Sequence, residues 1–457
     1  MEGVFDGMKN KTVDMTNGSI MKGLTALTMP IMIMNVAQSL FNLLDIWVVK
    51  VFGFESAVGA IGACGMLITL CTCLLIGISA GANVVTARHV GAKEKKLAES
   101  SIMTAIAFSI IGGVLLMILG SIFAKTFLVL TNCHVSLLSD ATLYFKLYFL
   151  ASPAIMVYNF AASLLRALGD SKKPMYFLFV CCICKILLTV LLISILRKPI
   201  ESVGIATIVS NVISSALALI ALLKNKVVAN LSIKRLRIDF KELKAILYNG
   251  VPAGLQSAMY ALANVIITSV VNTFGPDATT GISIANQFDG IMYQVSYAPS
   301  LATVPFVAQN IGAGRLDRAK KTLWCGIFIS TAFGATLGSL SAIFSRQLSF
   351  LMSSSEAVVS FSVQKMIIVS STYFICGINE VLGGTLKGMG KPVAPAVTSL
   401  LYMCVLRFIW VYFIFPHNPN LTFLYLVWPI GWVLSIITLS IIYIHTIFKY
   451  KTTLLKG

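Results

Sequence analysis

The feature that most constrains the fold of this chain is a series of long apolar runs that contain almost no charge. Residues 102–124 and 402–415 are two of them. In lipid every backbone N–H and C=O group must be satisfied within the protein, so only helices and closed barrels span a membrane. Barrel strands give short alternating segments, whereas these runs are continuous. The sequence therefore predicts an all-α polytopic membrane protein.

We expect twelve membrane spans, with approximate ranges 22–51, 55–84, 98–127, 138–165, 173–196, 202–223, 244–273, 279–309, 319–345, 358–386, 392–415 and 421–447. Of the 35 Lys and Arg residues, 26 fall in the termini and even-numbered loops. Seven, including Lys365, fall on the other side and its approaches, and Lys185 and Arg407 lie inside spans. Because cytoplasmic loops are rich in Lys and Arg, we expect both termini in the cytoplasm of a plasma or inner membrane.

Composition narrows the class of function. Basic cytoplasmic loops explain the net charge of +18, so we expect no nucleic-acid partner. Nine of the ten cysteines lie in apolar segments, where cysteine acts as a small apolar residue. The run CCIC at 181–184 has no ligand cluster beside it, which disfavours a metal site. With no HExxH, phosphate loop or acidic cluster, we expect neither an enzyme nor a cofactor.

The two halves of the chain repeat each other. TARHVGAK at 86–93 matches VAQNIGAG at 307–314, and LLRALG at 164–169 matches TLKGMG at 385–390, both with an offset of 221. Each half holds six spans, so the repeats are parallel and a substrate path between them is expected. The halves are an N-lobe (1–223) and a C-lobe (244–457), joined by a cytoplasmic linker (224–243).

Asp45 is a carboxylate inside the apolar run FNLLDIWVVK at 41–50. An ionised group at mid-bilayer costs about 2.5–3.5 kcal/mol, so such residues are candidates for function. Lys185 lies twelve residues before Arg197, about 18 Å by helix rise, which is too deep for easy snorkelling. Three interpretations stay open: Asp45 titrates, Asp45 and Lys185 form a permanent pair that is at least structural, or a proton or cationic substrate displaces the lysine.

The ordered motifs resemble the multidrug and toxic compound extrusion (MATE) transporters over nearly the whole chain. They are MTNGSIMKGLTALTMPIMIMNVAQSLFNLLD, AGANVVTARHVGAK, YNFAASLLRALGDSKKP, GVPAGLQSAMYALANV, ANQFDGIMYQVSYAPSLATVPFVAQNIGAGRLDRAKK, GGTLKGMGKP and LRFIWVYFIFP. The branch resembles the bacterial one without a glutamate in the seventh span, where this chain has Tyr260.

The resemblance implies two pseudo-symmetric six-helix lobes around a V-shaped central cleft. It implies export of cationic or amphipathic small molecules by antiport with H⁺ or Na⁺ through alternating access, with the protein a monomer in membrane lipid. A related alternative is a lipid-linked oligosaccharide flippase, which we disfavour because intramembrane charges are few. The resemblance also implies an ion-coupling cluster in the N-lobe, whose positions here are Asp45, Lys185, Thr189, Thr207 and Asn42.

Further polar and aromatic residues are candidates for the substrate cleft, with helix packing as the alternative role for each. They are Gln38, Tyr158, Asn159, Gln256, Asn264, Phe288, Asp289, Met292 and Glu380. We expect Asp289 to pair with Arg407, because both lie at a similar depth from the outer side. Glu380 is expected either to attract a cationic substrate or to reach a polar loop.

Overall fold

The computed structural model describes residues 12–52, 54–131, 133–225, 227 and 236–454, and no β-strand occurs among them. The first half forms α2 (Ile20–Val51), α3 (Glu55–Gly91), α4 (Lys95–Leu130), α5 (Val135–Leu150), α6 (Ser152–Ala167), α7 (Lys172–Leu196) and α8 (Pro199–Leu223). The second half begins with α9 (Phe240–Val271), η2 (Asn272–Phe274), α10 (Pro276–Gly312), α11 (Leu316–Ile343), α12 (Ser345–Phe350), α13 (Glu356–Ser370) and α14 (Tyr373–Gly388). It continues with α15 (Val393–Ser399), η3 (Leu400–Val405), α16 (Leu406–Ile409), η4 (Trp410–Ile414), η5 (Phe415–His417), α17 (Leu421–Tyr425) and α18 (Val427–Leu454).

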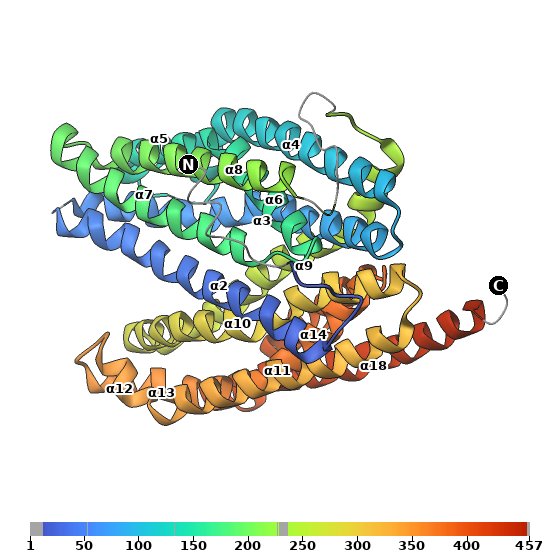
Figure 1. The fold of residues 1–457 in the computed structure, drawn as a ribbon. Helices are drawn as coiled ribbons and strands as arrows, with labels where there is room; N and C mark the ends of the chain where they lie inside the picture. Colours follow the sequence, from blue (N-terminus) through green and yellow to red (C-terminus); the bar gives the residue numbers. More distant parts are fainter. Residues whose placement is uncertain (1–11, 53, 132, 226, 228–235, 455–457) are drawn as a thin grey trace.

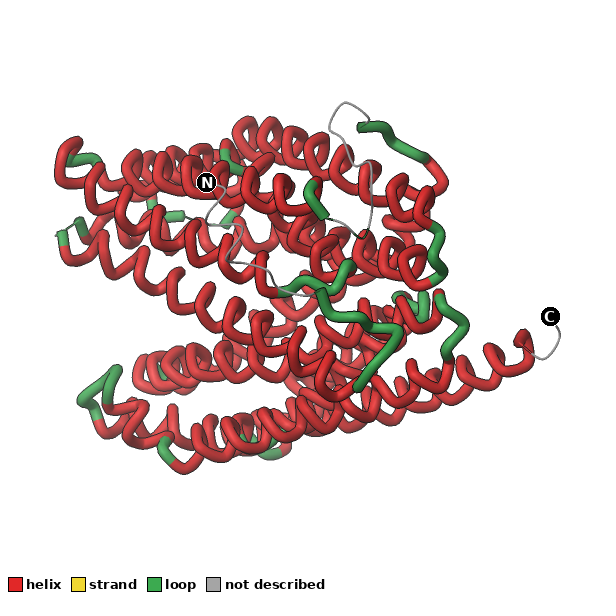
Figure 2. Tube along the Cα trace, viewed as in Figure 1, coloured by secondary structure: helices red, strands yellow, loops and turns green. Residues whose placement is uncertain are grey.

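The two halves form two helical lobes arranged as a V (Figures 1 and 2). The lobes diverge toward the ends of α2 and α7 on one arm and toward α12 and α13 on the other. They meet at the opposite end, which we call the converging end, where the start of α2 and the end of α18 lie. The expected all-α architecture is confirmed.

The number of spans differs slightly from the expected twelve. Among the described residues, nine helices are long and apolar enough to cross a membrane, or eleven if two bent helix pairs each count as one span. The remaining expected span, 279–309, corresponds to α10, a helix of 37 residues that is not among those eleven.

The fourth and tenth expected spans are bent pairs rather than continuous helices. The α5–α6 and α13–α14 pairs each bend by 46°. Pro153 follows the first break, and a proline lacks the N–H that would continue the helix. At the second break, hydroxyl groups of Ser371 and Thr372 donate to the Ile368 carbonyl. Ala151 and Thr372 are 221 residues apart, so both breaks obey the internal repeat.

Glycines bring α3 and α9 into close contact across the two lobes. A Cβ atom at Gly77 would lie 2.2 Å from Cα of Gly254, and one at Gly81 would lie 2.2 Å from the Ile246 carbonyl oxygen. From the other side, a Cβ at Gly250 would lie 2.5 Å from Cα of Ile78. Small residues spaced four apart allow such backbone approach in membrane helices. We call these four residues, Gly77, Gly81, Gly250 and Gly254, the glycine crossing.

The repeated VGAK and IGAG turns also face each other at the converging end. A Cβ at Gly91 would lie 2.0 Å from the Gln309 carbonyl oxygen, and one at Gly312 would lie 2.1 Å from the Arg88 carbonyl oxygen. Gln309 in turn donates from Nε2 to the Ala167 carbonyl at 2.7 Å, which joins α10 to α6. The repeat found in the sequence is therefore a contact between the two lobes.

Residues 12–19, which precede α2, are bound to both lobes. The Val13 N–H donates to the Gly169 carbonyl of the first lobe at 3.0 Å. From the second lobe, Asn310 donates to the Met15 carbonyl, and Arg318 donates to the carbonyl groups of Met15, Asn17 and Gly18. This segment reinforces closure at the converging end.

Candidate functional site

A buried carboxylate in the C-lobe lies beneath a cluster of tyrosines. Glu380 on α14 is 3% exposed, and its Oε1 accepts a hydrogen bond of 3.0 Å from the Tyr260 hydroxyl on α9. The Tyr260 ring lies 6.2 Å from the Tyr293 ring, which stacks on Tyr297 at 5.5 Å. Three helices, α9, α10 and α14, therefore converge on one acidic side chain. We call these four residues the tyrosine–glutamate site.

The chemistry of this site follows from the nature of its groups. Tyr260 is a neutral donor. Lys387, which is also buried, lies seven residues further along α14, about 10 Å by helix rise, and attracts Glu380 electrostatically without a direct ion pair among the described contacts. A buried carboxylate that no ammonium group contacts directly is stabilised by taking up a proton or by binding a cation. Aromatic faces add attraction for an organic cation. The site is therefore suited to a proton, a sodium ion or a cationic group.

A second polar cluster holds α10 and α13 together. Oδ2 of Asp289 lies 2.8 Å from Nζ of Lys365, and Asn286 also accepts from that ammonium group. Ser370 donates to Oδ1 of Asp289 at 3.3 Å, and the Tyr373 hydroxyl donates to its backbone carbonyl. Lys365 is only 2% exposed. This ion pair is buried within the C-lobe.

The prediction that Asp289 pairs with Arg407 is wrong. Arg407 instead donates from Nη1 to Oδ1 of Asn264 at 2.8 Å, and its guanidinium group lies 4.7 Å from the Trp428 ring centroid. Lys365 lies 5.5 Å from the same ring. The sequence alone predicts that Lys365 lies on the outer side or its approaches. The available signal was its position nine residues beyond Glu356, about 13 Å along a helix.

The N-lobe cluster is described only in part. The side chains of Asp45 and Asn42 lie outside the described residues, although both belong to α2. Lys185 on α7 is half-buried, has interaction partners, and lies near Tyr148 and Cys181. Thr189 is buried one turn further along the same helix. The proposed ion-coupling role of this cluster stays a prediction.

Thr207, the last member of the cluster, donates to the Val203 carbonyl of its own helix at 2.8 Å. Its hydroxyl proton therefore satisfies the backbone of α8, which leaves the hydroxyl oxygen as its remaining acceptor.

Most of the other predicted cleft residues either donate a hydrogen bond to a neighbouring group in the helix packing or lie at an exposed position. Tyr158 donates to the Pro174 carbonyl, Asn159 to the Ile155 carbonyl, and Gln256 to Oγ of Ser399. Gln38 is exposed on α2, whereas Phe288 is half-buried on α10. Met292 packs in the same apolar cluster as Tyr260 and Tyr293. Of the nine candidates, Glu380 and Met292 thus lie with the tyrosines, and Asp289 lies in the separate ion pair.

Within the described part of the chain, no group of three or more His, Cys, Asp or Glu side chains is arranged to hold a metal ion. The two C-lobe clusters each consist of a single carboxylate with hydroxyl, amide or ammonium groups. These are groups for binding protons, monovalent cations or organic ions.

Comparisons with known proteins agree with this architecture. A family model described as MatE matches residues 30–191 and 252–413. The probable multidrug resistance protein YoeA of Bacillus subtilis (strain 168) is 27% identical over 84% of each chain. A Shewanella oneidensis protein named FAD transporter is 24% identical over 80% of this chain and 82% of its own length.

Solved structures show the same fold. The outward-facing conformation of a multidrug resistance MATE family transporter aligns with a TM-score of 0.88 and 19% identity, over 97% of this chain and 99% of that one. A crystal structure of MATE in the bent conformation aligns with a TM-score of 0.88 and 18% identity, over 97% and 99%. The two matched segments of the family model cover both lobes.

Proposed function

Since the chain belongs to the MatE family of membrane transporters, we propose that it is a secondary active exporter of cationic or amphipathic small molecules. Movement of H⁺ or Na⁺ into the cell drives the export, and the two lobes alternate access to the site. Relatives named multidrug resistance proteins support the substrate class. The relative named FAD transporter marks an alternative substrate of opposite charge.

The shape of the V supports alternating access. The converging end carries the N-terminal segment and the end of α18, and the distribution of Lys and Arg favours a cytoplasmic position for both termini. The V then opens toward the outside, and the glycine crossing closes the cytoplasmic side. Reversal of this arrangement requires that the converging end separates while the arms approach each other.

The observation that most supports a transport mechanism is Glu380, a carboxylate buried under Tyr260, Tyr293 and Tyr297. In this proposal the carboxylate holds the coupling ion or the cationic part of the substrate, and the two compete for it. A shared site gives antiport directly, because binding of one species releases the other. Asp45 is the alternative coupling residue, in the opposite lobe.

The test is uptake of a fluorescent organic cation into inverted membrane vesicles, with proton and sodium gradients imposed separately. Wild type is compared with Glu380→Gln, Tyr260→Phe and Asp45→Asn. Glu356→Gln is the matched control, because Glu356 pairs with Arg346 at an exposed position. We expect gradient-driven uptake in wild type and in the control, and its loss in Glu380→Gln.

The other outcomes discriminate between the sites. Uptake that survives in Glu380→Gln and is lost in Asp45→Asn moves the coupling to the N-lobe. Uptake that survives in both variants contradicts coupling through either carboxylate. If wild type transports no cation under either gradient, the proposed substrate class is wrong, and an anionic compound such as FAD is tested next.

A further inference from the structure

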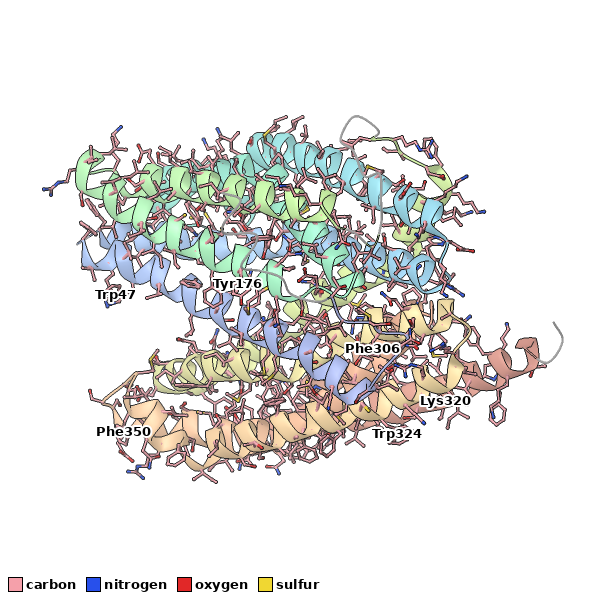
Figure 3. The ribbon with its side chains drawn as sticks, in the orientation of Figure 1. Trp47, Tyr176, Phe306, Lys320, Trp324 and Phe350 are labelled. Atoms are coloured by element: carbon pink, nitrogen blue, oxygen red, sulfur yellow. The ribbon has the colours of Figure 1, made fainter. Side chains whose placement is uncertain are left out.

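An open cavity at the converging end combines basic and apolar walls. Its volume is about 470 Å³. It lies between the start of α2 and the first half of α11, on the side of the C-lobe where Figure 3 labels Lys320 and Trp324. Its lining includes Ile20, Met21, Arg318, Lys321, Trp324 and Cys325. The cavity therefore joins the two halves of the chain.

The cavity is positively charged, and no described carboxylate pairs with its basic groups. Among the described residues, Arg318 donates only to neutral acceptors, namely Oδ1 of Asn310 and the carbonyl groups of residues 15, 17 and 18. The nearby carboxylate of Asp317 pairs with Lys320 at 3.5 Å, not with Lys321. Lys321 is exposed and forms no ion pair with a described residue. An anion in the cavity would meet both positive groups.

Along α11, from the cavity toward the C-terminal end of the helix, the exposed side chains change from charged to aromatic. Lys321 lines the cavity, Trp324 lies one turn further and is 68% exposed, and Phe328 lies one turn beyond that and is 65% exposed. The rise from Lys321 to Phe328 is about 10 Å. Tryptophan favours the membrane interface, where one side is apolar and the other is wet. The order of charge, interfacial aromatic and apolar surface matches a phospholipid from its phosphate to its acyl chains.

We propose that this cavity binds the headgroup of an anionic phospholipid from the cytoplasmic leaflet. The phosphate lies near Lys321 and Arg318, the glycerol region lies against Trp324, and the acyl chains follow Met21 and Phe328. A lipid bound there contacts α2 and α11 together and therefore favours the closed state of the converging end. The proposal does not depend on what the protein transports.

The experiment measures which lipid lies beside Trp324. The full-length protein is reconstituted with brominated phosphatidylglycerol or brominated phosphatidylcholine at equal mole fraction, and tryptophan fluorescence quenching is recorded. The signal of Trp324 is the difference between the protein and its Trp324→Phe variant, which removes the contribution of the other four tryptophans. The ratio of quenching by the two lipids gives the preference for negative charge.

We expect phosphatidylglycerol to quench Trp324 more strongly than phosphatidylcholine. Lys321→Ala should reduce this preference about fivefold, the factor for one basic residue at an anionic surface. The control Lys320→Ala removes the same charge one residue away, from a side chain that does not line the cavity, and should keep the preference. Both lysines are outside the packed core, so both variants should fold.

Three results would overturn the proposal. The first is equal quenching by the two lipids in the wild-type protein. The second is an equal loss of preference in Lys320→Ala and Lys321→Ala, which indicates general surface charge. The third is loss of the preference on addition of soluble glycerol phosphate, which indicates a site for a free phosphate rather than a lipid.

Discussion

The glycine crossing gives the sharpest test of how the lobes move. Gly81→Ala adds a Cβ that would lie 2.2 Å from the Ile246 carbonyl oxygen and 2.5 Å from the Gly250 nitrogen. Ordinary contact begins at 3.4 Å, so α3 and α9 must separate by on the order of 1 Å at this point. Overpacking of this kind costs about 1–3 kcal/mol. Both opposing atoms belong to the backbone, so no side chain can rotate away.

In the proposed mechanism α3 and α9 separate when the converging end opens, so the strain exists only while that end is closed. Gly81→Ala therefore shifts the equilibrium toward states in which that end opens, by roughly 5- to 150-fold for about 1–3 kcal/mol. The measurement is the distance between labels at Trp47 and Phe350, which lie on opposite arms of the V (Figure 3). Labels carried by non-natural amino acids avoid the chain's ten cysteines. The distance between the arms should shorten in Gly81→Ala.

Gly62→Ala is the matched control, because Gly62 is also in α3 and a Cβ there meets nothing within 4 Å. It should leave the label distance unchanged. The reasoning is refuted if Gly81→Ala folds with wild-type stability and the distribution of label distances equals that of the control. The glycine crossing would then be equally tight in both states and would act as a fixed pivot.

Two further predictions concern stability. Lys365→Met leaves the Asp289 carboxylate buried without its cation and should lower the free energy of unfolding by about 3–5 kcal/mol. Adding Asp289→Leu to this variant should restore most of the lost stability. Thermal unfolding in detergent measures both effects. Backbone N–H groups of Lys241 and Glu242 hold the pKa of Asp239 below its usual 3.8. Its stabilising effect is therefore present at neutral pH and is lost as the pH falls through that lowered pKa, so the melting-temperature deficit of Asp239→Ala should shrink in acid.

The all-α membrane architecture was accessible to sequence reasoning because it depends on many residues at once. Apolar runs and the offset of 221 are properties of long segments, so errors at single positions average out. The sequence matched the turns at 86–93 and 307–314 to each other, and the structure adds that these two stretches meet at the converging end. Pro153 marks the break near Ala151 in the sequence, whereas the break near Thr372 was missed because no proline marks it and the span stays apolar there.

The pairing of charged side chains could not be predicted from the sequence. Asp289 and Arg407 lie at similar depth, and depth was the only coordinate that the sequence supplied. The rotation of α10 and α13 about their axes decides that Lys365, and not Arg407, faces Asp289. The same holds for Glu380, since a helical position does not reveal that Tyr260 on another helix donates to it.

The relative depth of Asp45 and Lys185 in the membrane follows from how α2 packs against α7. The Phe41 and Phe179 rings lie 6.1 Å apart, so α2 and α7 pack against each other, and both helices start at the converging end. Asp45 lies four residues beyond Phe41, about 6 Å, and Lys185 lies six residues beyond Phe179, about 9 Å. The two residues are therefore at nearly the same level on neighbouring helices.

An ammonium group at that level competes with sodium for the carboxylate, so we predict that Lys185→Asn, which supplies an amide oxygen instead, increases the sodium dependence of transport. Lys185→Met is the control that removes the charge without adding a ligand oxygen, and it should give a smaller increase. Transport by inverted vesicles at graded sodium concentrations measures both. If ion dependence is unchanged in both variants, Lys185 does not limit cation binding at Asp45, and coupling belongs to the tyrosine–glutamate site of the other lobe.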